Sequence, residues 1–234
     1  MIITIDGPAG TGKSSVSQEV ARRLGYSFLD TGAMYRAIAL ATTRQHIAMD
    51  DLEALGGLAE HVTVDFDWSA NPPRVRLDGH DVADLIRTEA VSSGASKVAV
   101  APRVRAAMVH LQQKVGLARP DLVTEGRDQG TIVFPHAALK VYLTATTEER
   151  ASRRKLQLEA KGQHVDYAPL LEQIRERDAR DSGRAVGPLA IPAGAEVIDT
   201  TTLTQEEVTA KIVELTRSRM AAAGRGKGVG PWPS

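Results

Sequence analysis

The 234-residue sequence has no cysteine, few aromatic residues and no excess of charge of either sign. Without cysteine the chain can form neither disulfides nor thiolate metal sites, which fits a reducing compartment. Lysine plus arginine and aspartate plus glutamate each number 29, so no overall field attracts nucleic acid or an anionic membrane. With aromatic residues at 4%, stacking of single-stranded nucleic acid is not expected either. Any basic site must therefore be local.

Long apolar runs and several catalytic motifs are also missing. No apolar stretch is long enough to cross a bilayer, and the first expected strand begins at Ile2, which leaves no room for a signal peptide. We therefore expect a cytoplasmic protein that binds neither a membrane nor nucleic acid. The histidines show no H-E-x-x-H spacing, so a zinc site is not expected, and no G-x-S-x-G nucleophile elbow occurs.

A glycine-rich segment after the apolar run 2–5 is the most informative part of the sequence. It consists of Gly7, Pro8, Ala9, Gly10, Thr11, Gly12, Lys13, Ser14 and Ser15 and matches G-x-x-x-x-G-K-S. Its glycines let backbone N–H groups turn inward around an anion, and the following helix adds the positive end of its dipole. Lys13 can reach the β- and γ-phosphates, and the Ser14 hydroxyl is placed to bind Mg²⁺. Because the motif is complete and lies between an expected strand and helix, it predicts an ATP-binding P-loop rather than a simple turn.

Alternating strand and helix patterns indicate an α/β fold with parallel strands. Strands are expected at residues 2–5, 27–29, 121–124, 139–143 and 195–199, and helices at 13–24, 30–41, 50–55, 83–91, 95–100, 102–115, 147–161, 167–181 and from 204 onward. Gly25 is the expected C-terminal end of the first helix, Asp30 or Thr31 the N-cap of the second, and Thr204 the N-cap of the last. Between residues 61 and 83 a strict alternation predicts a small antiparallel sheet. The length suits one main domain that carries this insertion.

Arginine residues gather in three places that core packing does not explain. They are Arg103 and Arg105 at the start of an expected helix, Arg127 beside Asp128 after a buried strand, and Arg177, Arg180 and Arg184 with Asp181, which share one helix face if the helix persists. Two interpretations stay open for the last group. One is a solvated helix surface with an i,i+4 ion pair. In the other, all three arginine groups face the P-loop side of the sheet and bind a phosphate ester, which guanidinium groups hold bidentately.

A charged segment after the strand at 139–143 carries further arginines. Arg150, Arg153 and Arg154 lie in a region that is broken at Gly162. Such a segment could be a lid that closes over ATP during transfer. The alternative is an exposed helix with acidic residues at its N-terminal end.

Jointly these motifs resemble those of the bacterial cytidylate kinases, which are P-loop nucleoside monophosphate kinases. The resemblance runs from Ile2 to about Arg217 and rests on GPAGTGKSS at 7–15, LDTGAMYR at 29–36, PRVR at 102–105, EGRDQGT at 125–131 with VFP at 133–135, and RDARD at 177–181 with RAV at 184–186. The family fold implies a five-stranded parallel sheet flanked by helices, with a small antiparallel-sheet insertion and a short lid. It also implies a kinase domain at 1–220, with a CMP-binding subdomain at about 31–100 and a lid at about 150–170. The tail at 221–234 lies outside the resemblance, and its richness in glycine and proline predicts disorder.

The resemblance further implies ATP-dependent phosphorylation of CMP and dCMP in pyrimidine metabolism, with Mg²⁺, by a monomer. The implied catalytic residues are Lys13, Arg127 and Arg184, and the implied CMP-binding residues are Thr31, Arg36, Ser96, Arg105, Arg127, Asp128, Arg177, Asp181 and Arg184. Of these, Ser96, Arg105 and Asp128 would bind cytosine, while Arg177 and Asp181 would meet the ribose. Glu125 is a weaker candidate for binding a magnesium-bound water.

Rival functions share parts of this pattern. A P-loop kinase for another small acceptor, such as UMP or shikimate, would carry the same first motif. A guanine nucleotide switch normally shows N-K-x-D and D-x-x-G after its P-loop. Neither occurs here, and Asn71, the sole asparagine, precedes a proline. We therefore expect an enzyme rather than a switch.

Overall fold

The computed structural model describes residues 1–160 and 162–225, and their main element is a five-stranded parallel sheet. Its strands are β1 (Ile2–Asp6), β2 (Ser27–Asp30), β6 (Leu122–Gly126), β7 (Leu139–Thr144) and β8 (Glu196–Asp199), in the order β2-β6-β1-β7-β8. The central strands β1 and β6 are buried apart from Ile2, because helices cover both faces of a parallel sheet. The α/β class and the five parallel strands are thus confirmed.

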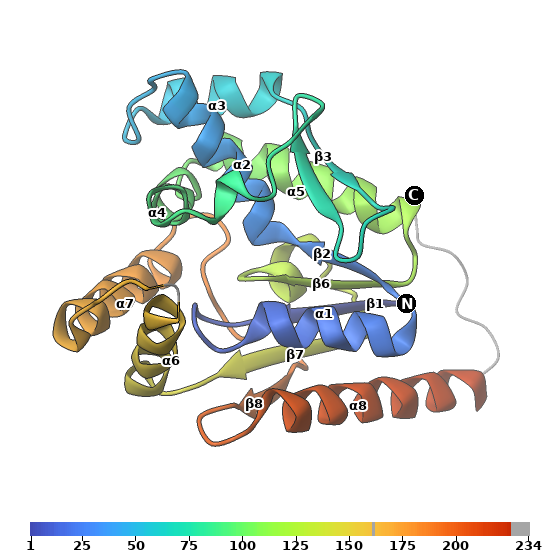
Figure 1. Ribbon diagram of the computed structural model, residues 1–234. Helices are drawn as coiled ribbons and strands as arrows, with labels where there is room; N and C mark the ends of the chain where they lie inside the picture. The colour runs from blue at the N-terminus through green and yellow to red at the C-terminus, as the bar shows by residue number, and fades with distance from the viewer. Residues whose placement is uncertain (161, 226–234) are drawn as a thin grey trace.

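Eight helices of the described chain surround this sheet (Figure 1). They are α1 (Lys13–Leu24), α2 (Thr31–Arg44), α3 (Leu52–His61), α4 (Glu89–Val98), α5 (Pro102–Ala118), α6 (Thr147–Glu159), α7 (Tyr167–Ser182) and α8 (Gln205–Arg225). One hydrophobic core joins the sheet to α1 and α8, and a second joins it to α2, α3, α4 and α5. Helices α6 and α7 pack on each other beyond the carboxyl ends of the strands. This leaves that edge of the sheet open to ligands.

Short-range signals fix several element ends as the sequence predicts. Gly25 ends α1 in a left-handed conformation (φ 69°), and its N–H bonds to carbonyls of the last turn. Asp30 caps α2 by accepting a hydrogen bond from Ala33 N. Thr204 and Glu207 form a reciprocal capping box that starts α8.

The inserted antiparallel sheet is confirmed within residues 61–83. It consists of β3 (Val64–Asp67), β4 (Arg74–Leu77) and β5 (His80–Asp81). The alternating apolar residues of β3 and β4 face the second core, where they pack near α2. The insertion thus packs against α2, whose residues Thr31 and Arg36 lie at the open edge of the main sheet.

Three expected boundaries are wrong. Helix α3 continues to His61 instead of stopping at residue 55. A 3₁₀ turn, η1 (Leu85–Arg87), and the single helix α4 replace the two helices expected at 83–91 and 95–100. Thr88 caps α4, and Gly94 inside it allows close packing, since an added Cβ would lie 3.2 Å from the Ala39 Cβ.

The third boundary concerns the end of the chain. Helix α8 includes residues 221–225, where disorder was expected from 221 onward. Alanines at 221–223 favour helix, which explains the extension. The rest of the expected tail, 226–234, lies outside the described residues. Across the described ranges, no helix combines the length and apolar character that a membrane span requires.

Candidate active site

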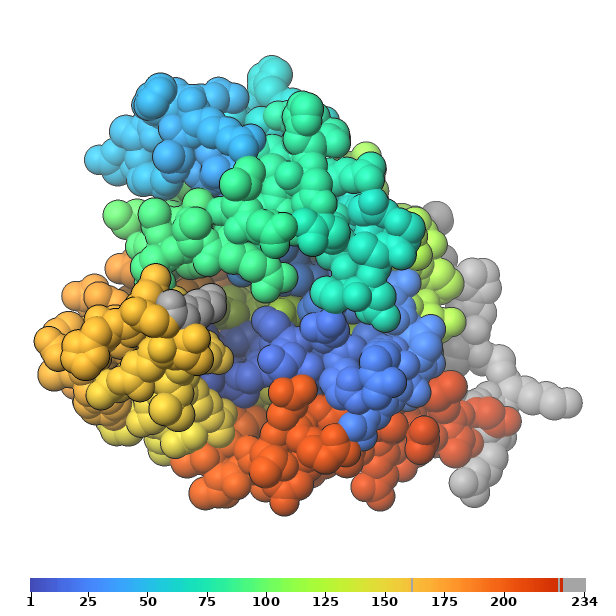
Figure 2. Space-filling model, in the orientation of Figure 1, coloured from blue at the N-terminus to red at the C-terminus, as the bar shows by residue number. Residues whose placement is uncertain are grey.

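A cavity of about 810 Å³ opens at the carboxyl edge of the main sheet. Its walls come from the P-loop, the ends of β2 and β6, helices α4, α6 and α7, and the segment after α7. Figure 2 shows the hollow between the green segment that contains α4, the yellow segment that contains α6, and the blue segment that contains α1. The position agrees with the general rule for ligand sites in parallel α/β sheets.

The P-loop forms one wall of this cavity. Gly10 and Gly12 both adopt φ near 85°, which side chains rarely tolerate, and α1 starts directly after Gly12. Lys13 is buried, and its Nζ donates to the Pro8 carbonyl at 2.6 Å inside the loop. Burial, followed by the positive charge of Arg127, lowers the pKa of Lys13 well below its usual value. Because burial disfavours the charged ammonium, a negatively charged phosphate bound beside Lys13 would stabilise it.

A group of arginines faces the P-loop across the cavity. Arg127 Nε donates to Asp181 Oδ2 at 2.8 Å, and Arg184 Nε donates to the Asp181 carbonyl at 3.2 Å. Burial and the charge of Arg127 lower the pKa of Arg177 to about 10. Among the described residues, Arg177 Nε and Arg184 Nη2 are buried without a hydrogen-bond acceptor. Crowded guanidiniums with free donors favour an anionic ligand between them.

The start of α2 contributes another arginine to the same wall. Arg36 lies in the cavity lining and pairs with Asp30 at 2.7 Å. Thr31 is buried, and its hydroxyl donates to the Glu125 carbonyl at 2.6 Å. The bond ties the first residue of α2 to β6, so Arg36 on α2 and Arg127 just after β6 approach the cavity from the ends of two neighbouring strands, β2 and β6.

A second polar pocket lies deeper in the cavity, where Arg105 and Asp128 form a buried ion pair. Tyr35 lies beneath the pair, with the Arg105 guanidinium carbon 5.8 Å from its ring centroid. Burial raises the pKa of Asp128, against the lowering influence of Arg105. Ser96 is buried nearby and accepts a 3.5 Å hydrogen bond from Arg180. Two Arg105 donors, Nε and Nη1, are buried without a hydrogen-bond partner among the described residues.

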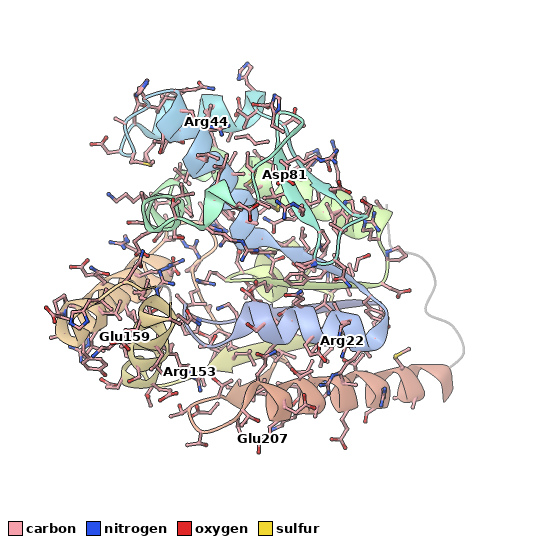
Figure 3. All side chains as sticks on the ribbon, in the orientation of Figure 1. Arg22, Arg44, Asp81, Arg153, Glu159 and Glu207 are labelled. Atoms are coloured by element: carbon pink, nitrogen blue, oxygen red, sulfur yellow. The ribbon has the colours of Figure 1, made fainter. Side chains whose placement is uncertain are left out.

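The candidate lid arginines all line the cavity. Arg150 donates to the Ala9 carbonyl of the P-loop at 3.2 Å and pairs with Asp178 of α7 at 2.6 Å. Arg153, which Figure 3 labels on α6, donates to the carbonyl of Thr200, just after β8. Arg154 pairs with Glu89 of α4 at 2.5 Å. Helix α6 is thus tied to both the P-loop and the opposite wall.

Glu125 stands between these walls, buried at the end of β6. Burial, and next the negative charge of Asp30, raise the pKa of Glu125 to about 7, while Lys13 and a hydrogen bond from Ser14 oppose the rise. Its Oε1 atom is buried and has no partner in the described chain. The carboxylate therefore has a coordination position to spare beside Ser14.

Glu125 also makes stability depend on pH. Because its folded-state pKa is raised, the folded protein binds more protons than the unfolded chain between about pH 4.5 and 7. Its contribution to the free energy of unfolding therefore falls as pH rises through this window. We expect the free energy of unfolding, measured with denaturant, to fall by about 1–3 kcal/mol more for wild type than for Glu125→Gln when the pH rises from about 5 to 8. Glu214→Gln, exposed on α8, is the control, and equal losses in wild type and Glu125→Gln would contradict the assignment.

The expectation for Arg103 is wrong, and the condition attached to the one for Arg184 is not met. Arg103 does not face the cavity but pairs with Glu53 and Glu60 of α3. Arg184 does not share the α7 face with Arg177, because the helix ends at Ser182. It still lines the cavity because the chain turns back after the helix. All the residues that the sequence analysis assigns to ATP, CMP or the lid line the cavity except Gly7, Pro8 and Thr11, which belong to the P-loop beside it.

Sequence reasoning missed the roles of three acids, Asp30, Asp178 and Asp6. The sequence marks Asp30 only as a possible helix cap and gives no signal for Asp178, the partner of Arg150. Asp6 is buried and accepts hydrogen bonds from two backbone N–H groups at the start of the π-helical turn η2 (Gln129–Val133). Burial raises the pKa of Asp6 to about 6. The position of Asp6 just before the P-loop was the available signal, since a charged residue there interrupts a buried strand.

A P-loop at the carboxyl edge of a five-stranded parallel sheet, facing a cavity lined by arginines, defines the class as a P-loop phosphotransferase. A family model described as Cytidylate kinase matches residues 3–218. Cytidylate kinase of Stutzerimonas stutzeri (strain A1501) is 49% identical, with 91% of this chain and 93% of the relative covered. Cytidylate kinase of Marinomonas sp. (strain MWYL1) is 47% identical, with 95% and 96% covered. The chain belongs to the cytidylate kinase family.

The fold has a structural relative as well. A crystal structure of an uncharacterized protein from Eubacterium ventriosum ATCC 27560 matches with a TM-score of 0.52 at 13% identity, covering 93% of this chain and 98% of that chain. At this identity the match concerns the fold alone. The family resemblance seen in the sequence is confirmed by the matches to cytidylate kinases.

Proposed function

We propose that this chain transfers the γ-phosphoryl group of ATP to the phosphate of CMP or dCMP, giving ADP and the nucleoside diphosphate. The family match over residues 3–218 carries this assignment. The cavity supports it, because one arginine-lined space joins a P-loop to a second polar pocket. Two anionic nucleotides bound end to end require such a concentration of cations.

The P-loop side of the cavity suits ATP. Its backbone N–H groups and Lys13 would hold the β- and γ-phosphates, and Arg150, Arg153 and Arg154 would approach them from α6. We propose that residues at about 150–170 act as a lid. Closure would exclude water, because water would otherwise compete with CMP for the phosphoryl group.

The opposite side suits the acceptor. Arg36, Arg127 and Arg184 would bind the CMP phosphate near Thr31, at the N-terminus of α2. This phosphate is already ionised near neutral pH, so its oxygen attacks without a dedicated general base. Catalysis then rests on alignment and on neutralising the repulsion between the reactants.

The buried Arg105–Asp128 pair suits the base. The carboxylate of Asp128 can accept from the exocyclic amine of cytosine, and Arg105 has donors for the ring acceptors. Uracil presents a carbonyl oxygen to Asp128 instead, which disfavours UMP. Arg177 and Asp181 would bind the ribose, and Ser96 would support the base pocket. We assign residues at about 31–100 to the CMP-binding subdomain.

We propose Mg²⁺, bound with ATP, as the cofactor. The Ser14 hydroxyl and the carboxylate of Glu125, the latter through water, are the groups that would hold it. Within the described residues no cluster of three or more ligating His, Cys, Asp or Glu side chains occurs. This fits Mg²⁺, which proteins often bind with few side chains together with substrate phosphates. When bound, the ion would reduce the charge on the β- and γ-phosphates.

We also propose that the enzyme acts as a cytoplasmic monomer without nucleic-acid or membrane partners. The cavity supports this, since one chain supplies all the proposed nucleotide contacts. The neutral net charge and the lack of cysteine fit the same proposal. Sedimentation equilibrium of the purified protein tests the oligomeric state.

A competition experiment tests the proposed reaction against the other kinases. CMP, UMP, AMP, GMP and shikimate are supplied together at equal concentration with ATP and Mg²⁺, and the products are separated. We expect CDP as the main product and little ADP without an acceptor. Dominant phosphorylation of another acceptor, or ADP release with water as fast as with CMP, would contradict the proposal.

A further inference from the structure

The segment after α7 folds back over the buried Arg105–Asp128 pair. Leu189 N donates to the Asp181 carbonyl at 2.8 Å, which returns the chain to the last turn of α7. Arg184 also donates to this carbonyl, from its Nε atom. Gly187 lies between Arg184 and Leu189 in the chain; it is buried and adopts φ 58°. The loop therefore presents bare backbone, without a side chain, to the ion pair.

The approach of Gly187 to this pair leaves no room for a methyl group. An added Cβ would lie 2.5 Å from Asp128 Oδ2 and 2.8 Å from Arg105 Cζ, and it would overlap Arg105 Nη2. The ends of long side chains can often move aside. Here both side chains are nearly inaccessible, at 1% and 5% exposure, and they bind each other above Tyr35. Buried, packed groups cannot yield without disturbing their neighbours.

We propose that Gly187 is a specificity-determining position, at which the loop backbone presses on the Arg105–Asp128 pair and fixes its orientation. The inference rests on the proposed function of this pair in binding cytosine. Hydrogen bonds to a base edge require both partners to be placed closely. A methyl group at position 187 displaces the guanidinium or the carboxylate and thereby weakens the choice of base.

Gly194 provides a matched control for the backbone. It has a similar conformation, φ 72°, but no atom lies within 4 Å of an added Cβ. Alanine at 194 therefore introduces the strain of a left-handed residue alone. Alanine at 187 adds the collision with the pair. Pro188 further restricts the backbone conformation of residue 187. Gly187→Ala is therefore also combined with Pro188→Ala and compared with Pro188→Ala alone, which removes this restriction from the comparison.

The experiment compares Gly187→Ala with Gly194→Ala and combines each with Arg105→Ala. For Gly187→Ala we expect the KM for CMP to rise about 10- to 100-fold and the preference for CMP over UMP to shrink, while ATP affinity stays within about twofold. Gly194→Ala should stay within about twofold of wild type in all three values. In the Arg105→Ala background, which removes most of the collision, Gly187→Ala should add less than about threefold.

The outcomes separate this inference from the proposed function. If Gly187→Ala behaves like Gly194→Ala, or if its effect adds fully to that of Arg105→Ala, the inference is wrong. If Gly187→Ala fails to fold alone but folds when combined with Arg105→Ala, the collision is supported. If neither the single variant nor the double variant folds, glycine is needed for the backbone and the inference is wrong. If wild type does not prefer CMP to UMP, the proposed base site fails and the inference fails with it.

Discussion

Replacing Lys13 with methionine should lower kcat for phosphoryl transfer by about 10²- to 10³-fold while the protein stays folded. The ammonium of Lys13 is buried inside the P-loop, where charge on the transferring group would lie. Burial lowers the pKa of Lys13, so the protein interior disfavours the charge that catalysis uses. Methionine keeps the apolar stem and removes that charge. The midpoint of thermal unfolding should therefore stay the same or rise.

Single-turnover rates with saturating ATP and CMP measure this loss, and calorimetry measures stability. Lys211→Met, exposed on α8 and outside the cavity lining, is the matched control and should change neither value. Lys13→Arg should not restore the rate, because a planar guanidinium does not fit the space of a compact ammonium. A rate within about threefold of wild type for Lys13→Met would show that the loop amides alone stabilise the transferred phosphoryl group.

The parts of the fold that the sequence predicts well depend on local chemistry. The P-loop can be predicted because its glycines, its lysine and its serine each have a distinct role in binding phosphate or Mg²⁺. The five main strands are readable because they are short apolar runs between helical patterns. Gly25 and Thr204 mark helix ends through backbone conformation and capping, which involve only neighbouring residues. These signals depend only on residues that are close together in the sequence.

The arginine contacts could not be predicted in the same way. Arg103 and Arg105 are two residues apart, yet one pairs with α3 at the surface and the other is buried against Asp128. Helical geometry places residues two apart on different faces, but the sequence does not say which face meets the cavity. Arg184 reaches the site only because the chain reverses after α7. Such reversals depend on long-range contacts.

The arginine partners of the site's acids escaped prediction for a related reason, although Asp181 itself is among the implied CMP-binding residues. Asp30, Asp178 and Asp181 sit beside arginines in sequence or in space, and each pattern also fits a helix cap or a surface ion pair. In the fold they hold arginines around the cavity: Arg36, Arg150 and Arg127. Positive charge is thus balanced at the walls while donors remain directed at the cavity. An anionic substrate meets cations that are already oriented.

Replacing Asp128 with alanine should remove the choice between CMP and UMP and destabilise the protein by about 3–5 kcal/mol. Asp128 is the buried acceptor that pairs with Arg105. Without it, Arg105 remains buried with its charge uncompensated, which accounts for the loss of stability. Cytosine also loses the acceptor for its amine, so kcat/KM for CMP should fall by about 10²- to 10³-fold while ATP affinity is kept.

Two further variants separate the effect on base choice from the effect on folding. Asp128→Asn keeps the shape but offers both an acceptor, the amide carbonyl, and a donor, the amide NH2. It can therefore bond to either base, and the ratio of kcat/KM for CMP to that for UMP should approach one. Glu196→Ala breaks the exposed Glu196–Arg219 pair, 3.1 Å long, and should cost no more than about 1 kcal/mol. If Asp128→Ala and Asp128→Asn both kept the wild-type preference for CMP, the base would have to bind elsewhere in the cavity, and the buried pair would be structural only.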